Sequence, residues 1–253
     1  FISDIHSVNV STKLDELREK IEISSSYQDY APAIGTDTDT VAFTSNRNGV
    51  PQIWLKKNGK HSQLTNYQDF AYITDKQFSP DGKSLLFLRN RVPFILDLNS
   101  NLITEPLIEL KHSSSPIWTC DGKNILVSSK DNGAWNLYQI DMETLSAIKK
   151  LPHVISIKSD CINSSYFVMH ESKKGVYKLE NDMLSATEVL PNYYSGFSFN
   201  WQVENGSFFF LKNNAMAKVR LDSGEVLMVE MPEGNISSFS IHKNRVYFSK
   251  RFV

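Results

Sequence analysis

Short apolar runs recur along the chain at nearly equal intervals, and most are followed by a second run in which apolar and polar residues alternate. The apolar runs are VAFTSN, LLFLRN, ILVSSK, YFVMHE, FFFLKN and VYFSKR, centred on Phe43, Phe87, Val127, Val168, Phe210 and Phe248. Their centres are spaced by 38 to 44 residues. The alternating runs are QIWLKK, FILDLN, NLYQID, GVYKLE and AKVRLD. Runs of this length and pattern predict β-strands.

One complete unit of the repeat extends from Tyr67 to Leu110 and reads as four short strands. The first three cover Phe70–Phe78, Leu85–Leu88 and Phe94–Leu98, and the fourth ends at Leu110. A four-stranded sheet of this size cannot bury its own apolar faces, so it must stack on neighbouring sheets.

The first two strands of this unit are joined by the turn Ser79–Lys83, which reads SPDGK. Pro80 fixes φ at the first corner, Asp81 hydrogen-bonds the following backbone, and Gly82 accepts a positive φ. A second copy, TCDGK, occupies Thr119–Lys123. The pattern indicates hairpin turns and requires no catalytic role.

A period near forty residues with four strands in each repeat predicts an all-β, six-bladed β-propeller. We expect a single domain covering residues 1–253, with blades at 27–65, 66–110, 111–152, 153–191, 192–232 and a last one built from 233–253 plus 1–24.

The last blade needs strands from both ends of the chain. Ser3–Val10 and Leu17–Ser24 alternate like a third and a fourth strand, whereas the segment after Pro232 supplies only a first and a second. Joining them removes exposed sheet edges. In the alternative interpretation, Leu14–Lys20 forms one helical turn and further blades lie outside this sequence.

Composition narrows the class of protein. The chain has 253 residues, 41% hydrophobic and 11% aromatic, with a formal net charge of −1. These values fit a globular all-β protein and give no overall attraction to nucleic acid, so we expect no nucleic-acid contact by this segment. No apolar run is long enough to cross a bilayer. Because the sequence begins at Phe1, we expect a processed chain or part of a longer one, attached to a membrane only through a segment outside these residues.

Motifs for catalysis are missing. The sequence contains no glycine-rich phosphate loop, HExxH, CxxC or GxSxG. An active site in the central channel would need clustered acids or histidines, but the predicted inner strands contribute only Asp75 and Asp160 as acidic residues. We therefore expect no enzyme activity, no catalytic residues, no metal site and no cofactor.

Two cysteines and two histidines occupy matching places in neighbouring blades. Cys120 and Cys161 are 41 residues apart, and inner strands of adjacent blades usually hold Cα atoms beyond the ~7 Å limit for a disulfide. We expect two buried thiols, with a disulfide as the alternative. His112 and His153 are expected to be independent surface residues, although a metal-binding or pH-sensitive pair is the other interpretation.

The predicted propeller has two ends, which we call the loop face and the turn face. The loop face carries the connections between blades and the turns between second and third strands, and the turn face carries the remaining turns. Aromatic and basic residues gather on the loop face: Tyr30, Arg47, Tyr67, Phe70, Arg89, Arg91, Trp135, Tyr193 and Tyr194. Such residues are enriched at binding hot spots. We predict that the loop face binds a protein, a peptide or a small anionic ligand. The alternative is that these are ordinary loop and inter-blade packing residues.

Several stretches resemble the repeats of TolB-type propellers, which typically read S-P-D-G-K-x-I-A-F-x-S-x-R-x-G-x-x-x-I-Y. They are Tyr30–Thr65, SPDGKSLLFL and SSKDNGAWNLYQID. The resemblance is strong in the first three blades and weak beyond them. SNRNGVPQIWLK and KKGVYKLEND further resemble the extracytoplasmic halves of ToxR/CadC-like regulators. This resemblance implies a periplasmic sensory domain of an inner-membrane protein, with its DNA-binding part outside this sequence.

Two classes of function follow. In the first, the propeller is a binding or sensing module that passes ligand occupancy to an attached domain, or a TolB-like protein-interaction module of the periplasm. In the second, it is an accessory domain that gates a prolyl oligopeptidase-like peptidase. An adjoining hydrolase segment would favour the second class, and an adjoining winged helix with an apolar span would favour the sensor.

Overall fold

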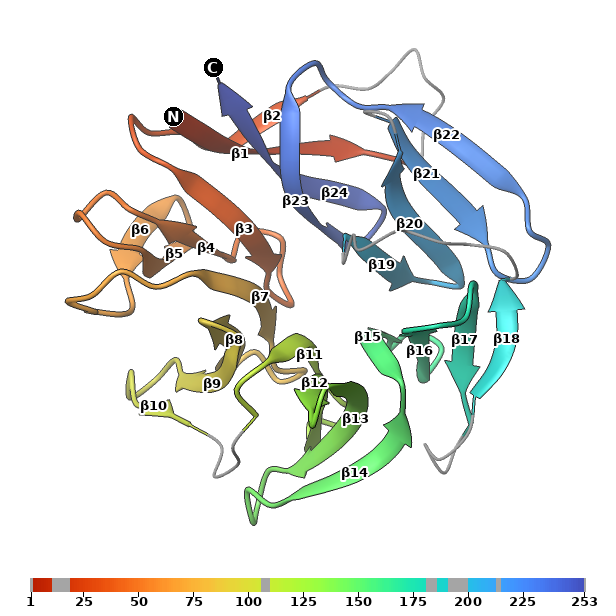
Figure 1. The fold of residues 1–253 in the computed structure, drawn as a ribbon. Coiled ribbons are helices and arrows are strands. Elements are labelled where there is room, and N and C mark those ends of the chain that lie inside the picture. Colours follow the sequence, from red (N-terminus) through yellow and green to blue (C-terminus); the bar gives the residue numbers. More distant parts are fainter. Residues whose placement is uncertain are drawn as a thin grey trace.

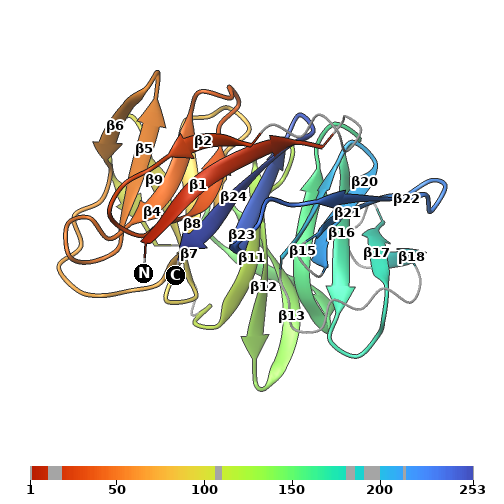
Figure 2. The ribbon, with the colours of Figure 1, turned by 90° about the horizontal axis from the view of Figure 1, so that it is seen from above.

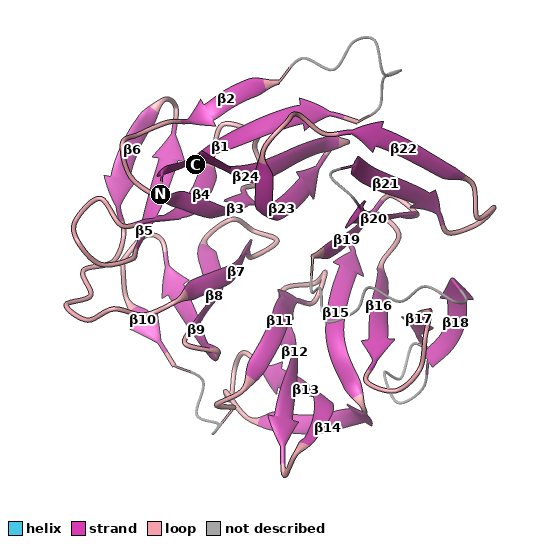
Figure 3. Ribbon diagram, turned by 45° about the horizontal axis from the view of Figure 1, so that its top comes forward, coloured by secondary structure: helices cyan, strands magenta, loops and turns pink. Residues whose placement is uncertain are grey.

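The computed structural model describes residues 2–10, 19–105, 110–180, 186–190, 200–212 and 215–252. Six four-stranded antiparallel sheets are arranged as blades around a central axis (Figure 1). Within the described residues every regular element is a strand (Figure 3), and no helix is present that would be long and apolar enough to cross a membrane. The prediction of an all-β, six-bladed propeller is confirmed.

Each blade runs from an inner strand at the axis to an outer strand at the rim. The inner strands of blades 1 to 6 are β3 (Asp29–Ile34), β7 (Ile73–Phe78), β11 (Ser113–Trp118), β15 (Val154–Asp160), β19 (Trp201–Glu204) and β23 (Asn235–His242). The second strands are β4 (Val41–Ser45), β8 (Ser84–Arg89), β12 (Asn124–Asp131), β16 (Ser165–His170), β20 (Ser207–Lys212) and β24 (Arg245–Phe252). The third strands are β5 (Gln52–Lys57), β9 (Val92–Asp97), β13 (Ala134–Asp141), β17 (Val176–Leu179), β21 (Ala215–Arg220) and β1 (Ile2–Asn9). The outer strands are β6 (Lys60–Gln63), β10 (Ile103–Thr104), β14 (Ala147–Pro152), β18 (Ala186–Leu190), β22 (Val226–Glu230) and β2 (Lys20–Ile23).

Blade 6 is assembled from both ends of the chain. β1 pairs with β24 along its whole length, from Ile2 opposite Phe252 to Asn9 opposite Arg245. β2 then pairs with β1 at the rim. The two labelled ends consequently lie close together (Figure 1). Ring closure by both termini is confirmed, whereas most of the segment in which the alternative placed a helical turn lies outside the described residues.

The hydrophobic core is divided into six clusters, each lying between two neighbouring blades. Strand alternation produces this division, because successive side chains point to opposite faces of a sheet. On β8, Leu85 and Phe87 pack against blade 1, and Leu86 packs against blade 3. Each blade therefore covers the apolar face of the next, and Figure 2 shows the sheets side by side from another direction.

The two Asp-Gly turns form as predicted. The Asp81 carboxylate accepts hydrogen bonds from the Ser79 hydroxyl at 2.6 Å and the Lys83 backbone N–H at 3.0 Å, and Gly82 has φ of 70°. The copy at Thr119–Lys123 repeats both contacts through Asp121. These turns set the register of the first and second strands in blades 2 and 3.

A buried histidine lies inside the closing blade. The His6 ring stacks on Phe248 with centroids 5.8 Å apart, and its Nδ1 lies 2.7 Å from Glu19 Oε1. Lys250 Nζ is 3.1 Å from the same oxygen. Burial lowers the pKa of His6 below its ordinary value of 6.5, the Lys250 charge adds to this effect, and Glu19 and Asp4 oppose it.

We predict that His6 makes the fold less stable in acid. Because its pKa is lower in the folded state, the unfolded chain binds more protons below about pH 6.5, and the free energy of unfolding falls as pH decreases. His6→Phe keeps an aromatic ring against Phe248 and removes the titration. Urea unfolding at pH 5 and pH 8 should show a smaller difference in the variant than in the wild type. An unchanged difference would contradict the assignment.

Candidate functional site

A cavity of about 440 Å³ lies in the central channel. It is lined by inner strands of all six blades and by residues of the turns that follow some of them, including Thr36, Pro80 and Cys161. These turns belong to the turn face, so the cavity lies toward the turn face and away from the loop face. Its volume falls within the range of small-molecule sites, on the order of 300–1,000 Å³.

Bulges in the inner strands shape the cavity wall. The register between first and second strands shifts once in each of blades 1, 2, 3, 4 and 6. In the first three blades a non-glycine residue with positive φ lies within the bulge: Ala31, Asp75 and Ser115. A bulge bends a strand and re-aims its side chains. In blade 2 it places Asp75 and Lys76 at the cavity wall.

Lys158 on β15 is the least satisfied charged group of the cavity wall. Lys158 as a whole is only 9% exposed. Within the described part of the chain, its ammonium has no hydrogen bond and no ion pair within 4.0 Å. Burial lowers the pKa of Lys158, and the charge of Asp75 partly opposes this. An ammonium that is partly desolvated and has no counter-ion favours a bound anion at this position.

Lys76 on β7 is also buried, but it has a partner. Its Nζ donates a 2.6 Å hydrogen bond to Thr44 Oγ1, and the Thr44 hydroxyl donates to the Ile73 carbonyl at 3.1 Å. Burial lowers the pKa of Lys76 to about 7, against the opposing charge of Asp75. Thr44 is fully buried on β4, so the Lys76 ammonium is directed to the boundary between blades 1 and 2.

The acidic groups at the ends of β15 and β19 hold neighbouring blades together. Asp160 accepts hydrogen bonds from the backbone N–H groups of Asn205 at 3.1 Å and Gly206 at 2.8 Å. Glu204 does the same for Lys243 and Asn244 at 2.7 and 2.9 Å. In each case a carboxylate caps the turn of the next blade. Asp160 was one of the two acidic residues expected in the channel. Its carboxylate instead accepts hydrogen bonds from the turn of the next blade.

His242 ends β23 and lines the cavity. Among the described residues its buried Nε2 has no hydrogen-bond partner. Burial lowers the pKa of His242, Lys243 lowers it further, and Glu204 and Asp37 oppose the effect. This ring is therefore a neutral polar group of the wall near neutral pH.

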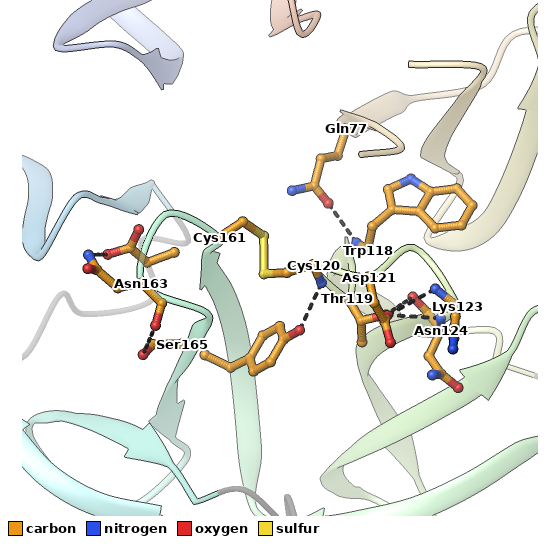
Figure 4. The surroundings of a disulfide bond; sticks show 12 residues. Gln77, Trp118, Thr119, Cys120, Asp121, Lys123, Asn124, Cys161, Asn163 and Ser165 are labelled. Atoms are coloured by element: carbon orange, nitrogen blue, oxygen red, sulfur yellow. Dashed lines mark hydrogen bonds between the residues drawn. A yellow bond between two sulfur atoms is a disulfide. The ribbon is translucent and has the colours of Figure 1, made fainter. Parts of the chain in front are cut away.

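The expectation of two free thiols is wrong, because Cys120 and Cys161 form a disulfide (Figure 4). Their Cα atoms are 5.2 Å apart. The cysteines lie in the turns that follow β11 and β15 rather than within the inner strands, and these turns approach more closely than the strand spacing suggested. The Cys120 N–H also donates to the Tyr166 hydroxyl at 2.8 Å. The bond joins blades 3 and 4 beside the cavity.

Part of the predicted loop-face site is brought together between blades 1 and 2. The Arg89 guanidinium lies over the Tyr67 ring, 4.3 Å from its centroid, and is 2.6 Å from Asp69. Phe70 and Tyr72 are 61% and 66% exposed and form an edge-to-face pair. Among the described residues, this pair is the aromatic feature of the loop face most open to a partner.

The other predicted loop-face residues are more dispersed. Arg47 pairs with Asp29 at 2.9 Å and lies over the Trp54 ring, so it stabilises blade 1. Burial raises the pKa of Tyr30 to about 12. Arg91 lies in the turn after β8, and Trp135 lies on β13. Tyr193 and Tyr194 lie outside the described residues. Binding at the loop face stays a prediction.

Sequence reasoning missed Lys76 and Lys158. The signal was present, because each is a lysine inside a predicted inner strand, YITDKQF and SIKSD. A catalytic site in the channel was expected to contain acids or histidines, so these lysines were not singled out. The alternative interpretation of His112 and His153 as a pair gains no support, since His153 lies 3.7 Å from Glu171 and its side chain is 59% exposed. Within the described ranges, no group of three or more His, Cys, Asp or Glu side chains is arranged to hold a metal ion.

Comparisons with known proteins find similarity in structure alone. No protein-family model matches the chain, and no curated protein matches it in sequence. Among solved structures, a candidate TolB from Agrobacterium tumefaciens superposes with a TM-score of 0.75 at 13% identity, covering 100% of this chain and 99% of that one. TolB from Acinetobacter baumannii gives 0.67 at 17% identity, covering 91% of this chain and 65% of that one, which is less than two thirds of its length.

A peptidase is similar to the same degree. The puromycin-hydrolysing peptidase of Mycobacterium tuberculosis gives a TM-score of 0.66 at 13% identity, and the match covers 89% of this chain and 42% of the peptidase. The chain is thus a TolB-like six-bladed propeller in its fold. Identities this low say nothing about the ligand.

We predict that the disulfide contributes strongly to stability. Cys120→Ala combined with Cys161→Ala removes a cross-link between residues 41 apart, and a loop of that size is worth roughly 4 kcal/mol in the chain-entropy model. Urea unfolding of the double variant should show a loss of this order. Wild-type protein treated with dithiothreitol should lose a similar amount. A loss below about 1 kcal/mol would contradict the prediction.

Proposed function

We propose that the chain is a non-enzymatic binding module of an extracytoplasmic compartment, and that its ligand occupies the central cavity. The observation that carries this proposal is Lys158, a residue only 9% exposed whose ammonium has no counter-ion among the described residues, on the wall of a cavity of small-molecule size. The disulfide supports an oxidising compartment, because such bonds are rare in the cytosol. The resemblance of the sequence to ToxR/CadC-like regulators supports the finer proposal of a periplasmic sensory domain of an inner-membrane regulator.

The cavity also favours binding over catalysis. Of the two inner-strand acids, Asp160 is engaged by two backbone N–H groups of blade 5. His242 and Asp75 line the wall from separate blades, and no hydrogen bond joins them in the described part. General acid–base catalysis needs a side chain positioned within hydrogen-bond reach of the proton that it transfers, whereas a binding site needs only charge and shape.

A peptidase-gating propeller is the second candidate. The observation in its favour is the match to the puromycin-hydrolysing peptidase, of which this chain covers 42%. A hydrolase segment in the neighbouring coding sequence would support it.

We expect a cavity-filling variant to abolish ligand binding. Gln202 lines the cavity from β19, so Gln202→Trp should occupy space that the ligand needs. Thermal denaturation would be measured with a library of organic acids, amino acids and short peptides. Compounds that raise Tm of the wild type should not raise that of Gln202→Trp.

Two controls locate the effect. Lys149→Trp adds the same side chain at an exposed position of β14 and should leave the response unchanged. The double variant Phe70→Ala with Arg91→Ala removes two of the predicted loop-face residues. The same compounds should still raise its Tm. If Gln202→Trp keeps the response and the loop-face variant loses it, the ligand binds at the loop face and the cavity proposal is wrong.

A further inference from the structure

The charges around the cavity do not balance. Two lysines, Lys76 and Lys158, line it together with one inner-strand acid, Asp75. Within the described residues, neither ammonium has a carboxylate oxygen within 4.0 Å, although the Asp75 charge acts on both. The wall therefore carries two amino groups against one inner-strand carboxylate, in a place largely enclosed by protein where electrostatic interactions are stronger than in bulk water.

The excess is located at Lys158 rather than at Lys76. Lys76 donates to Thr44 Oγ1, which is fully buried in blade 1. Lys158 donates to no described residue. Of the two lysines, the one without a partner is consequently Lys158.

Register explains why Lys158 lacks a partner. It pairs with Phe167 on the second strand, and the equivalent residues in blades 2 and 6 are Gln77 and Ser240, which pair with Leu86 and Tyr247. Gln77 accepts a 2.7 Å hydrogen bond from the Trp118 N–H of the next blade. Ser240 donates to the Pro32 carbonyl of the next blade at 3.0 Å. Blade 4 has a cation at the position that makes an inter-blade hydrogen bond in blades 2 and 6.

The rest of the wall is part apolar and part polar. Its apolar residues include Pro116 and Ile117 from β11, Phe239 and Ile241 from β23, and Pro32 and Ala33 from β3, and polar side chains such as Ser159 and Ser240 lie among them. The apolar part favours an uncharged body over a second charged group. The uncharged amide of Gln202 is placed to orient a polar atom of the ligand.

We propose that the cavity binds an organic monoacid. Its carboxylate pairs with Lys158, and its apolar body contacts the apolar wall residues of blades 3 and 6. This inference rests on the proposed function and names the ligand class of the same site. One unpaired cation matches one negative charge. A ligand with two or more charges would leave the remainder buried without a counter-charge.

The first experiment uses probes that share one body. Isothermal titration calorimetry at pH 7 would compare hexanoate, hexyl phosphate, hexanol and hexylamine on the wild-type protein. Hexanoate should bind best, and hexanol at least about tenfold more weakly, since a charge-assisted hydrogen bond is worth about one factor of ten or more. Equal or tighter binding of hexanol, hexylamine or hexyl phosphate would overturn the ligand class.

Variants of Lys158 test the anchor. Lys158→Met should weaken hexanoate binding by about tenfold or more and leave hexanol unchanged. Lys158→Arg keeps the charge and should stay within about threefold. The matched control is Lys83→Met, because Lys83 is on the turn face with its side chain 69% exposed. Hexanoate binding to Lys158→Met at wild-type strength would overturn the role of Lys158.

A measurement without ligand gives an independent test. If the Lys158 ammonium is partly desolvated and has no counter-ion in the ligand-free protein, Lys158→Met removes an unfavourable charge and should raise its Tm. A lower Tm would mean that Lys158 has a structural partner, and the proposal would fail. The proposed function and the proposed ligand class can be contradicted independently of each other. Uncharged or cationic compounds that stabilise the wild type but not Gln202→Trp would leave the cavity as the binding site and exclude only the monoacid.

Discussion

The packing of one blade's apolar face against the next is the interaction on which this molecule depends. A single four-stranded sheet exposes two faces, and only a closed ring covers all of them. The six clusters between blades show this directly: Phe87 faces one neighbour and Leu86 the other. Because the core lies between the blades, the axis itself need not be filled. The ring therefore leaves a cavity at its centre without losing its main source of stability.

Polar contacts near the axis add specificity to this packing. The carboxylates of Asp160 and Glu204 cap turns of the following blades, and Gln77 and Ser240 make single hydrogen bonds across the same kind of boundary. Between blades 3 and 4 a disulfide serves this purpose. Against this background Lys158 stands out, because it occupies an equivalent position and stabilises no boundary in the described part of the chain. A residue that differs from its equivalents in other blades and makes no stabilising contact in the structure is a good candidate for function.

The sequence predicted the fold well and the site poorly, for identifiable reasons. Strand alternation, the spacing of the runs around Phe87 and Val127, and the Asp-Gly turns are local signals, so blade number and closure followed from them. The disulfide was missed because the separation of Cys120 and Cys161 was judged from the spacing of inner strands, whereas both lie in turns. Lys158 was missed because its isolation depends on register with Phe167 and on what blade 5 offers, and neither is a local property of the sequence.

The pairing of β1 with β24 also sets the order in which the molecule can be completed. During synthesis β1 leaves the ribosome before the other described strands, and its partner β24 emerges after all of them. Blades 1 to 5 are each contiguous in the chain and can form as they appear, while the edge of β1 that pairs with β24 stays unpaired. Since contacts between distant residues are slow to form, closure of blade 6 is expected to be the final step of folding. Until that step, the ring is open on both sides of the gap, and the central cavity has one wall missing.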